Sequence, residues 1–181
     1  MTVEWPFPAD YTIEISERIE RLGIRRVLGY PGATPVEPNR ELSSGAVLTV
    51  KPNHADAWVG IFDSFNRSQR SVSWPDGRSV CVFTSYGSCC VVRADDPMIW
   101  FEAVMILPRL LHPVVSHGLV VLGDWTHLIA YDADGLAWES QRLVLDDLKV
   151  LECHDDVLRV QGLDPGGITE LEVDLATGRA L

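Results

Sequence analysis

Residues 71–95 read SVSWPDGRSVCVFTSYGSCCVVRAD, and they contain the clearest turn in the chain. Short runs rich in Val, Phe and Cys are interrupted by Pro75-Asp76-Gly77. Proline presets φ for the start of a turn, and glycine accepts the positive φ that often ends one. Residues 71–74 and 79–84 are therefore expected to pair as two strands of an antiparallel hairpin.

The second half of this stretch recurs later in the chain. Residues 80–95, VCVFTSYGSCCVVRAD, align without gaps on residues 119–134, LVVLGDWTHLIAYDAD, at an offset of 39. Each copy is expected to form a strand, a four-residue tip and a second strand, followed by an Ala-Asp that begins another turn. A looser third copy covers residues 157–178, and the common feature is patterning rather than identity.

The repeated strands, with Asp-Ala-Asp-Gly at residues 132–135 and Trp138 after it, resemble the blades of quinoprotein-type β-propellers over residues 80–181. The resemblance implies four-stranded blades of about 40 residues that stack on one another. The first 70 residues do not show the repeat, and the chain has room for only about four blades. The fold expected is mainly β, with hairpin repeats forming a partial propeller-like or meander sheet.

The remaining segments complete the expected single domain of residues 1–181, irregular over 1–45 and β-hairpin from 46 onward. Ile15, Ile19 and Leu22 have helical spacing, which predicts a short N-terminal helix, although residues 11–15 also alternate as in a strand. A proline-rich loop is expected over residues 29–45. Strands are expected at 46–51 and 57–62, while 98–107 fits either a strand or a short helix ended by Pro108.

Composition restricts the possible functions. The 181 residues are 46% hydrophobic, which is enough for a core, and no apolar run is long enough to span a bilayer. The N-terminus lacks a secretory signal, so a cytoplasmic location is expected. Residues 1–97 carry 12 acids and 10 bases, and residues 98–181 carry 14 acids and 5 bases, which gives net charges of −2 and −9. This charge disfavours nucleic acid and would attract a basic protein partner, but solubility alone is the simpler explanation of it.

The cysteines and histidines do not form a metal-binding pattern. Cys89 and Cys90 are adjacent in an expected strand, so their side chains should lie on opposite faces. His112 and His117 are five residues apart, a spacing that suits neither a strand nor a helix as a metal pair. No metal and no cofactor are expected, and the propeller resemblance brings no quinone site because no matching acidic constellation is present.

One group of polar residues around the 119–134 hairpin is a possible ligand region. If residues 123–126 form the tip, Leu122 pairs with His127, and His117 lies opposite Asp132. His117, Asp124, His127 and Asp132 would then converge, and a His-Asp pair can orient a general base. A structural hydrogen bond is the simpler interpretation, because the sequence offers no nucleophile to accompany it. The paired aspartates at 95–96, 146–147 and 155–156 are interpreted as turn formers.

Aromatic residues at the hairpin tips give the functional expectation. Most tryptophans should be core residues, but Trp125 is expected at a solvent-facing tip beside Asp124, and Tyr86 aligns with it. Exposed tryptophan is enriched among interface hot spots. The sequence therefore favours a non-catalytic interaction protein, adaptor or immunity-like, that uses Tyr86, Trp125 and Asp124. The alternative is a small-ligand binder or enzyme that uses the His117, Asp124, His127 and Asp132 region.

Overall fold

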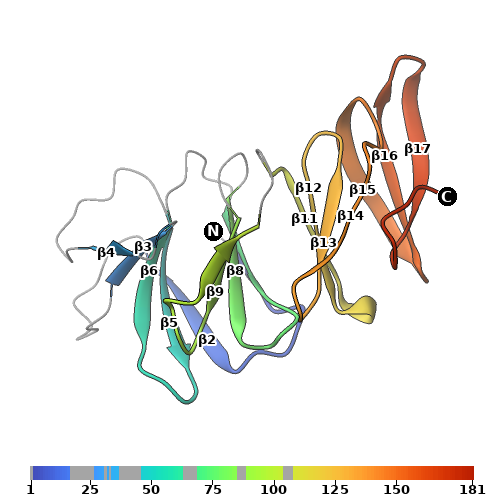
Figure 1. Cartoon of the computed structure of the whole chain (residues 1–181). Coiled ribbons are helices and arrows are strands. Elements are labelled where there is room, and N and C mark those ends of the chain that lie inside the picture. The colour runs from blue at the N-terminus through green and yellow to red at the C-terminus, as the bar shows by residue number, and fades with distance from the viewer. Residues whose placement is uncertain are drawn as a thin grey trace. The chain divides into compact units, whose positions relative to one another are not determined.

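The computed structural model describes residues 2–16, 27–30, 32, 34–36, 46–62, 69–84, 89–103 and 108–181. It divides into two compact units, Met1–Val104 and Met105–Leu181. The described residues are mainly β-strand (Figure 1). The prediction of a single domain stays a prediction, and each unit is described by itself.

The described residues of the first unit form two five-stranded sheets. One has the order β2-β5-β6-β3-β4, with β3 parallel to β6, and the other has the order β1-β7-β8-β9-β10, with β1 parallel to β7. All other neighbours are antiparallel. The strands are β1 (Thr2–Glu4), β2 (Tyr11–Ser16), β3 (Val27–Tyr30), β4 (Thr34–Pro35), β5 (Ala46–Pro52), β6 (Trp58–Phe62), β7 (Gln69–Ser73), β8 (Ser79–Thr84), β9 (Cys89–Arg93) and β10 (Trp100–Glu102).

A shared apolar cluster joins the two sheets of this unit. Trp58 and Phe62 from one sheet and Val82 and Cys90 from the other are almost wholly buried in the same cluster. The indole Nε1 of Trp58 donates a hydrogen bond to the carbonyl of Ala94 over 2.8 Å, so its polar atom is satisfied inside the core. Burial on this scale is the main stabilising term of such a sandwich.

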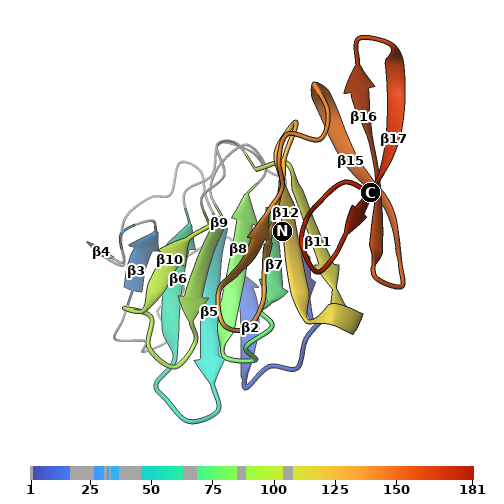
Figure 2. The ribbon, with the colours of Figure 1, turned by 45° about the vertical axis from the view of Figure 1, so that its right-hand side comes forward.

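The second unit also contains two sheets, both wholly antiparallel. The first has the order β11-β12-β13-β14. The second has the order β15-β16-β17, and its three strands are labelled in Figure 2. Their elements are β11 (Leu110–Val114), a short 3-10 helix (Val115–His117), β12 (Leu119–Gly123), β13 (Leu128–Tyr131), β14 (Leu136–Glu139), β15 (Asp146–His154), β16 (Val157–Asp164) and β17 (Gly167–Asp174). Trp138 and Leu158 lie in the cluster between these sheets.

Most of the expected hairpins are confirmed. β5 pairs with β6, and β7 pairs with β8 across the Pro75-Asp76-Gly77 turn. The two aligned copies form the β8–β9 and β12–β13 hairpins, and the third copy forms β16–β17. The sheets within each unit are open in the described residues, so no closed propeller is formed there.

The structure corrects two expectations about residues 1–45. The short N-terminal helix is not supported, because Tyr11–Ser16 pairs with β5 as strand β2; residues 17–26 lie outside the described residues. The expected loop over 29–45 contains part of β3 and all of β4. Of the two alternatives for residues 98–107, the strand is confirmed for Trp100–Glu102, which form β10, and residues 104–107 are not described. In the described part of the chain, no helix is long and apolar enough to cross a membrane.

Candidate functional site

The β12–β13 tip is organised by one aspartate. The carboxylate Oδ1 of Asp124 accepts hydrogen bonds from the backbone N–H of Thr126 at 2.6 Å and of His127 at 2.7 Å. The backbone N–H of Asp124 donates to the carbonyl of His127 across the tip at 3.2 Å. Aspartate is favoured in such turns because its short side chain reaches the amides two and three residues ahead. Residues 124–127 therefore form an ordered four-residue tip.

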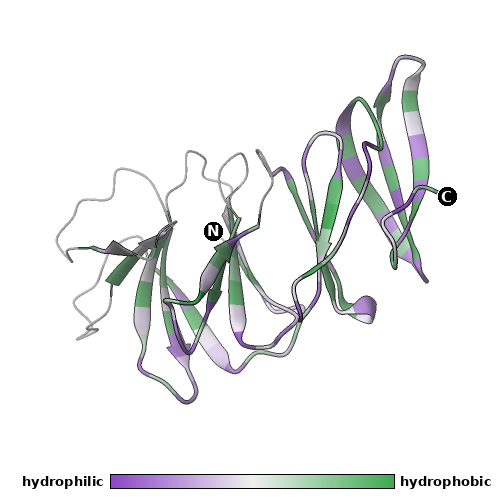
Figure 3. Cartoon of the chain, in the orientation of Figure 1, coloured by the Kyte–Doolittle hydropathy of each residue, from purple (hydrophilic) through white to green (hydrophobic). Residues whose placement is uncertain are grey.

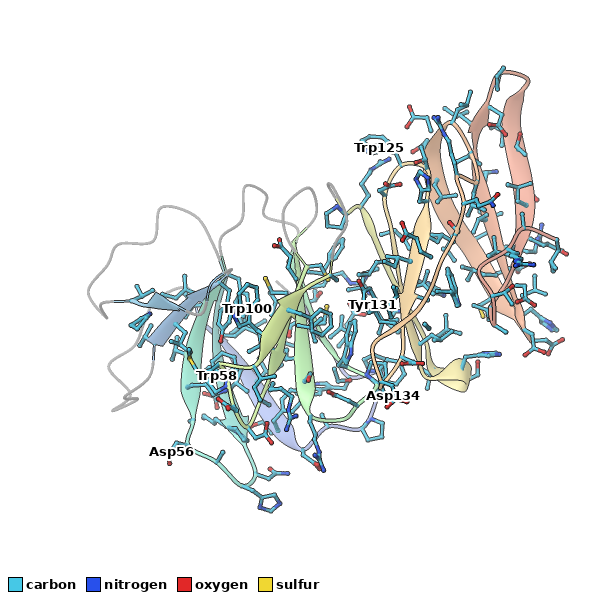
Figure 4. The ribbon with its side chains drawn as sticks, in the orientation of Figure 1. Asp56, Trp58, Trp100, Trp125, Tyr131 and Asp134 are labelled. Atoms are coloured by element: carbon cyan, nitrogen blue, oxygen red, sulfur yellow. The ribbon has the colours of Figure 1, made fainter. Side chains whose placement is uncertain are left out.

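Trp125 lies at this tip with 36% of its surface exposed (Figure 4). Its backbone is held from a second sheet, since the N–H of Leu148 donates to its carbonyl at 3.0 Å. Its ring is held by Arg109, whose guanidinium carbon lies 3.4 Å from the ring centroid. Stacking of this kind is worth about 0.5–1 kcal/mol at an exposed site. An exposed tryptophan is thus presented in a fixed orientation.

Arg109 is itself positioned by the backbone and by a carboxylate. Its N–H donates to the carbonyl of Gly123 at 2.8 Å, and its Nη1 lies 3.5 Å from Oδ1 of Asp147. Asp147 also accepts a hydrogen bond from Nζ of Lys149 at 2.6 Å. That hydrogen bond and the two nearby cations hold the pKa of the Asp147 carboxyl below its ordinary range. We call Arg109, Asp124, Trp125 and Asp147 the Trp125 surface.

The tip register differs from the expected one by two residues. Leu122 pairs with Ile129 rather than with His127, because the tip comprises residues 124–127 instead of 123–126. The strand pairing therefore does not set His117 opposite Asp132. Oδ1 of Asp132 instead accepts hydrogen bonds from the N–H of Asp134 at 2.8 Å and of Gly135 at 3.0 Å, which closes its own turn.

The two histidines of the expected ligand region have separate partners. Nε2 of His117 lies 2.9 Å from Oδ1 of Asp156, and its Nδ1 lies 2.9 Å from the hydroxyl of Ser116. Nδ1 of His127 lies 2.5 Å from the hydroxyl of Thr126 and 3.7 Å from Oδ1 of Asp124. The contacts of His127 stay within its own tip, whereas His117, the last residue of the 3-10 helix, reaches Asp156 in the turn between β15 and β16. The four predicted residues are thus divided among three hydrogen-bonded groups.

Most of the other tryptophans lie in the core, as the sequence predicted. Trp58, Trp74 and Trp138 are at most 7% exposed, and Trp100 packs against the core, as expected. The tip residue Tyr86 lies outside the described residues, so the proposed two-aromatic patch stays a prediction.

The register of the β8–β9 hairpin determines which cysteines are neighbours. Val82 pairs with Cys90 and Phe83 with Cys89, which excludes a direct Cys81–Cys90 or Phe83–Cys90 pair. Cys89 and Cys90 do lie on opposite faces. Sγ of Cys81 is 3.4 Å from Sγ of Cys89, on the diagonal of the hairpin. All four cysteines are free, and no group of three or more metal-ligating side chains occurs in the described part of the chain.

The aspartate pairs act mainly in turns and ion pairs. Oδ1 of Asp96 accepts the N–H of Met98, and Oδ1 of Asp146 accepts the N–H of Asp147. Asp95 forms two hydrogen bonds with the guanidinium of Arg93, which lowers the pKa of its carboxyl. Asp95 lies in the bend after β9, and Asp155 and Asp156 form the turn between β15 and β16, as the turn interpretation predicted, whereas Asp146 and Asp147 are the first residues of strand β15. Asp95 adds an ion pair that the sequence did not indicate.

Two hollows escaped the sequence reasoning because turns distant in sequence build them. One, in the first unit, has a volume of about 230 Å³ and is lined by Asp10, Tyr11, Pro52, His54, Arg78, Ala94 and Asp95. The other, in the second unit, has about 730 Å³ and is lined by residues including Glu139, Arg142 and Arg179. Arg142 is held there by the carbonyls of Val144 and Leu145. No local motif marks either hollow.

No protein-family model matches the chain. No curated protein matches it either. The resemblance to quinoprotein-type blades therefore stays a prediction.

Proposed function

We propose that this chain is a non-catalytic protein-interaction protein, adaptor or immunity-like, that binds a basic partner through the Trp125 surface. The observation that carries the proposal is an exposed tryptophan whose ring and backbone are both held in place. Tryptophan buries a large area on binding and has only two side-chain torsions to fix. Holding it before contact reduces the ordering cost that association must overcome.

The charge of the second unit supports the choice of partner. Residues 105–181 carry 13 acids and 5 bases, a net charge of −8 with histidine neutral. A field of this sign speeds encounter with a basic protein and repels the phosphate backbone of a nucleic acid. Complementary charge contributes more to association rate and selectivity than to affinity. Trp125 would supply the apolar contact and the surrounding carboxylates the attraction.

The contacts of the four polar residues give less support to a small-ligand site or enzyme. Asp124 and Asp132 close turns, and His117 contacts Asp156. Catalysis by a His-Asp pair also needs a nucleophile or substrate within reach of the base. A cytoplasmic location completes the proposal, supported by the neighbouring free thiols of Cys81 and Cys89, which a reducing compartment would preserve.

Photo-crosslinking in the native cells tests this function. A photoreactive amino acid at Thr126, beside Trp125, is compared with one at Thr177, an exposed turn residue of the same unit. We expect a discrete product with a basic protein from position 126 only, and its loss when Trp125→Ala is added. A product independent of Trp125, an acidic partner, or no difference between the two positions would contradict the proposal.

A further inference from the structure

Strand β17 forms an edge of its sheet, since the order of that sheet is β15-β16-β17. A short segment after β17 turns back along part of this edge. The N–H of Asp174 donates to the carbonyl of Arg179, and the N–H of Leu181 donates to the carbonyl of Glu172, both at 2.9 Å. Glu172 and Asp174 therefore direct backbone groups away from β16.

The first half of β17 also has backbone groups that point away from β16. Alternate residues of a strand direct their backbone N–H and C=O to the same side, so Ile168 and Glu170 direct theirs outward like Glu172. Within the described residues, no hydrogen bond reaches the backbone groups of Ile168 or Glu170 from that side. The first half of β17 thus presents a row of donors and acceptors on which a further strand can pair.

The side chains of these residues share the outer face of the sheet. Leu158 and Val173 pair directly and are both fully buried, which defines the inner face. Ile168, Glu170 and Glu172 alternate with the inner residues, and hydrophobic and hydrophilic positions alternate along β17 in Figure 3. Ile168 is 70% exposed and pairs with Leu163, which is 42% exposed. An exposed apolar pair therefore lies beside the open edge.

The outer face next to this pair is acidic. The guanidinium of Arg159 contacts Glu152 and Glu170, while Glu172 lies exposed on the neighbouring strand. Three carboxylates thus accompany one guanidinium. An added strand would place alternate side chains beside Ile168, Glu170 and Glu172.

We propose that an extended basic segment of a partner protein adds to the outer edge of β17 at Ile168–Glu170. Its outer-face side chains would be basic opposite the glutamates and apolar opposite Ile168. Its inner-face side chains would be apolar, because they lie beside Thr169 and Leu171, which are half-buried at the rim of the core. Backbone hydrogen bonds supply affinity in this mode, and alternate side chains supply selectivity.

A second copy of this chain fits the edge less well. Antiparallel pairing of two β17 strands centred on Glu170 would place like carboxylates opposite each other, and directly opposed like charges destabilise a strand pair. Charged side chains along an edge commonly prevent such self-association. The same carboxylates attract a strand of opposite charge. The edge of β17 shares no residue with the Trp125 surface, so binding at either surface can fail without the other.

A labelled peptide of alternating lysine and valine serves as the probe, with binding to the whole chain measured by fluorescence anisotropy. Its N-methylated counterpart keeps the charges but loses alternate backbone donors. We expect the N-methylated peptide, and a peptide with glutamate in place of lysine, to bind at least about tenfold more weakly. Equal binding of the N-methylated peptide would reduce the interaction to charge alone and overturn strand addition.

Two substitutions at one position separate charge from backbone pairing. Glu170→Gln removes the carboxylate but keeps the outward N–H, whereas Glu170→Pro removes both, and proline is tolerated where an edge N–H faces solvent. We expect a few-fold loss of peptide binding for E170Q, at least about tenfold for E170P, and none for W125A. Equal losses for E170Q and E170P would contradict the proposal. If the E170P variant does not fold, the difference in binding between the unmodified and the N-methylated peptide, measured on the wild-type chain, tests strand addition instead. A wild-type dimer that E170Q strengthens would instead identify a second copy as the occupant.

Discussion

The guanidinium carbon of Arg109 lies 3.4 Å from the centroid of the Trp125 ring, while 36% of the surface of that tryptophan stays exposed. The side chain of Trp125 is therefore both ordered before binding and accessible to a partner. Stability and binding can therefore respond differently when Trp125 is removed.

We expect Trp125→Ala to lower the free energy of unfolding by less than about 2 kcal/mol, since the stack contributes only about 0.5–1 kcal/mol. Urea titration measures this change. The matched control is Trp138→Ala, because Trp138 is 7% exposed and its Nε1 donates to the carbonyl of Leu175 at 2.6 Å. The control should lose about 3–5 kcal/mol. Equal losses for the two variants would make Trp125 a core residue and remove the basis of the interface.

Oxidation should connect Cys81 to Cys89 rather than to Cys90. The Sγ atoms of Cys81 and Cys89 are 3.4 Å apart, whereas Cys90 lies on the opposite face of β9. All three lie between Arg78 and Arg93, so one tryptic peptide that loses two hydrogens reports the bond. Cys90→Ala should keep this mass change and Cys89→Ala should abolish it. The reverse result would show that the register of β8–β9 is wrong.

Native-state alkylation should follow burial. Cys81, Cys89 and Cys90 are at most 1% exposed, and the neighbouring Cys81 thiol together with burial raises the pKa of the Cys89 thiol well above its ordinary value. Cys153 is only partly buried, although burial also raises its pKa. Since the thiolate is the reactive form, we expect iodoacetamide to modify Cys153 first. Modification of Cys89 at an equal rate would contradict this expectation.

The local turns were predictable from sequence, because their stabilising contacts are local. Oδ1 of Asp76 accepts the N–H of Arg78 and of Ser79, and Gly77 adopts a φ of 69°, as its residue type favours. The strands on either side followed from their apolar patterning. These two signals were sufficient for most of the hairpins from residue 46 onward.

The register of the hairpins was not predictable in the same way. Asp124 holds residues 124–127 in the tip, and a shift of one tip residue changes every cross-strand partner. Contacts distant in sequence, such as His117 with Asp156 and Arg109 with Trp125, have no local pattern. Trp125 itself was identified, because tip exposure follows from the hairpin alone, but the arginine that orients it was not.

Acid should weaken the attachment of β1 to β7. The guanidinium of Arg70 donates two hydrogen bonds to the carboxylate of Glu4, at 2.7 and 2.8 Å, and lowers the pKa of that carboxyl. Because the pKa is lower in the folded state, the stabilisation is fully present above the unfolded value of about 4.3 and is lost as the pH falls through the folded value. The pair is partly exposed, so its contribution stays below about 1 kcal/mol.

The difference in unfolding free energy between wild type and Glu4→Gln should vanish in acid. A difference that persists below pH 3 would assign the effect to packing.

Val144, in the connection between β14 and β15, packs against the backbone of Gly162 in β16. A Cβ on Gly162 would lie 2.5 and 2.7 Å from the two methyl carbons of Val144, which is itself 2% exposed. Gly162→Ala should therefore cost about 1–3 kcal/mol of stability through overpacking. The nearby turn offers a control, since a Cβ on Gly166 meets nothing within 4 Å, and Gly166→Ala should change stability by less than about 0.5 kcal/mol. Adding Val144→Ala to Gly162→Ala provides the space, so the double variant should lose less than the two single losses combined, with a coupling of about 0.5–3 kcal/mol by urea titration. Strict additivity would show that Val144 does not pack on the backbone of residue 162.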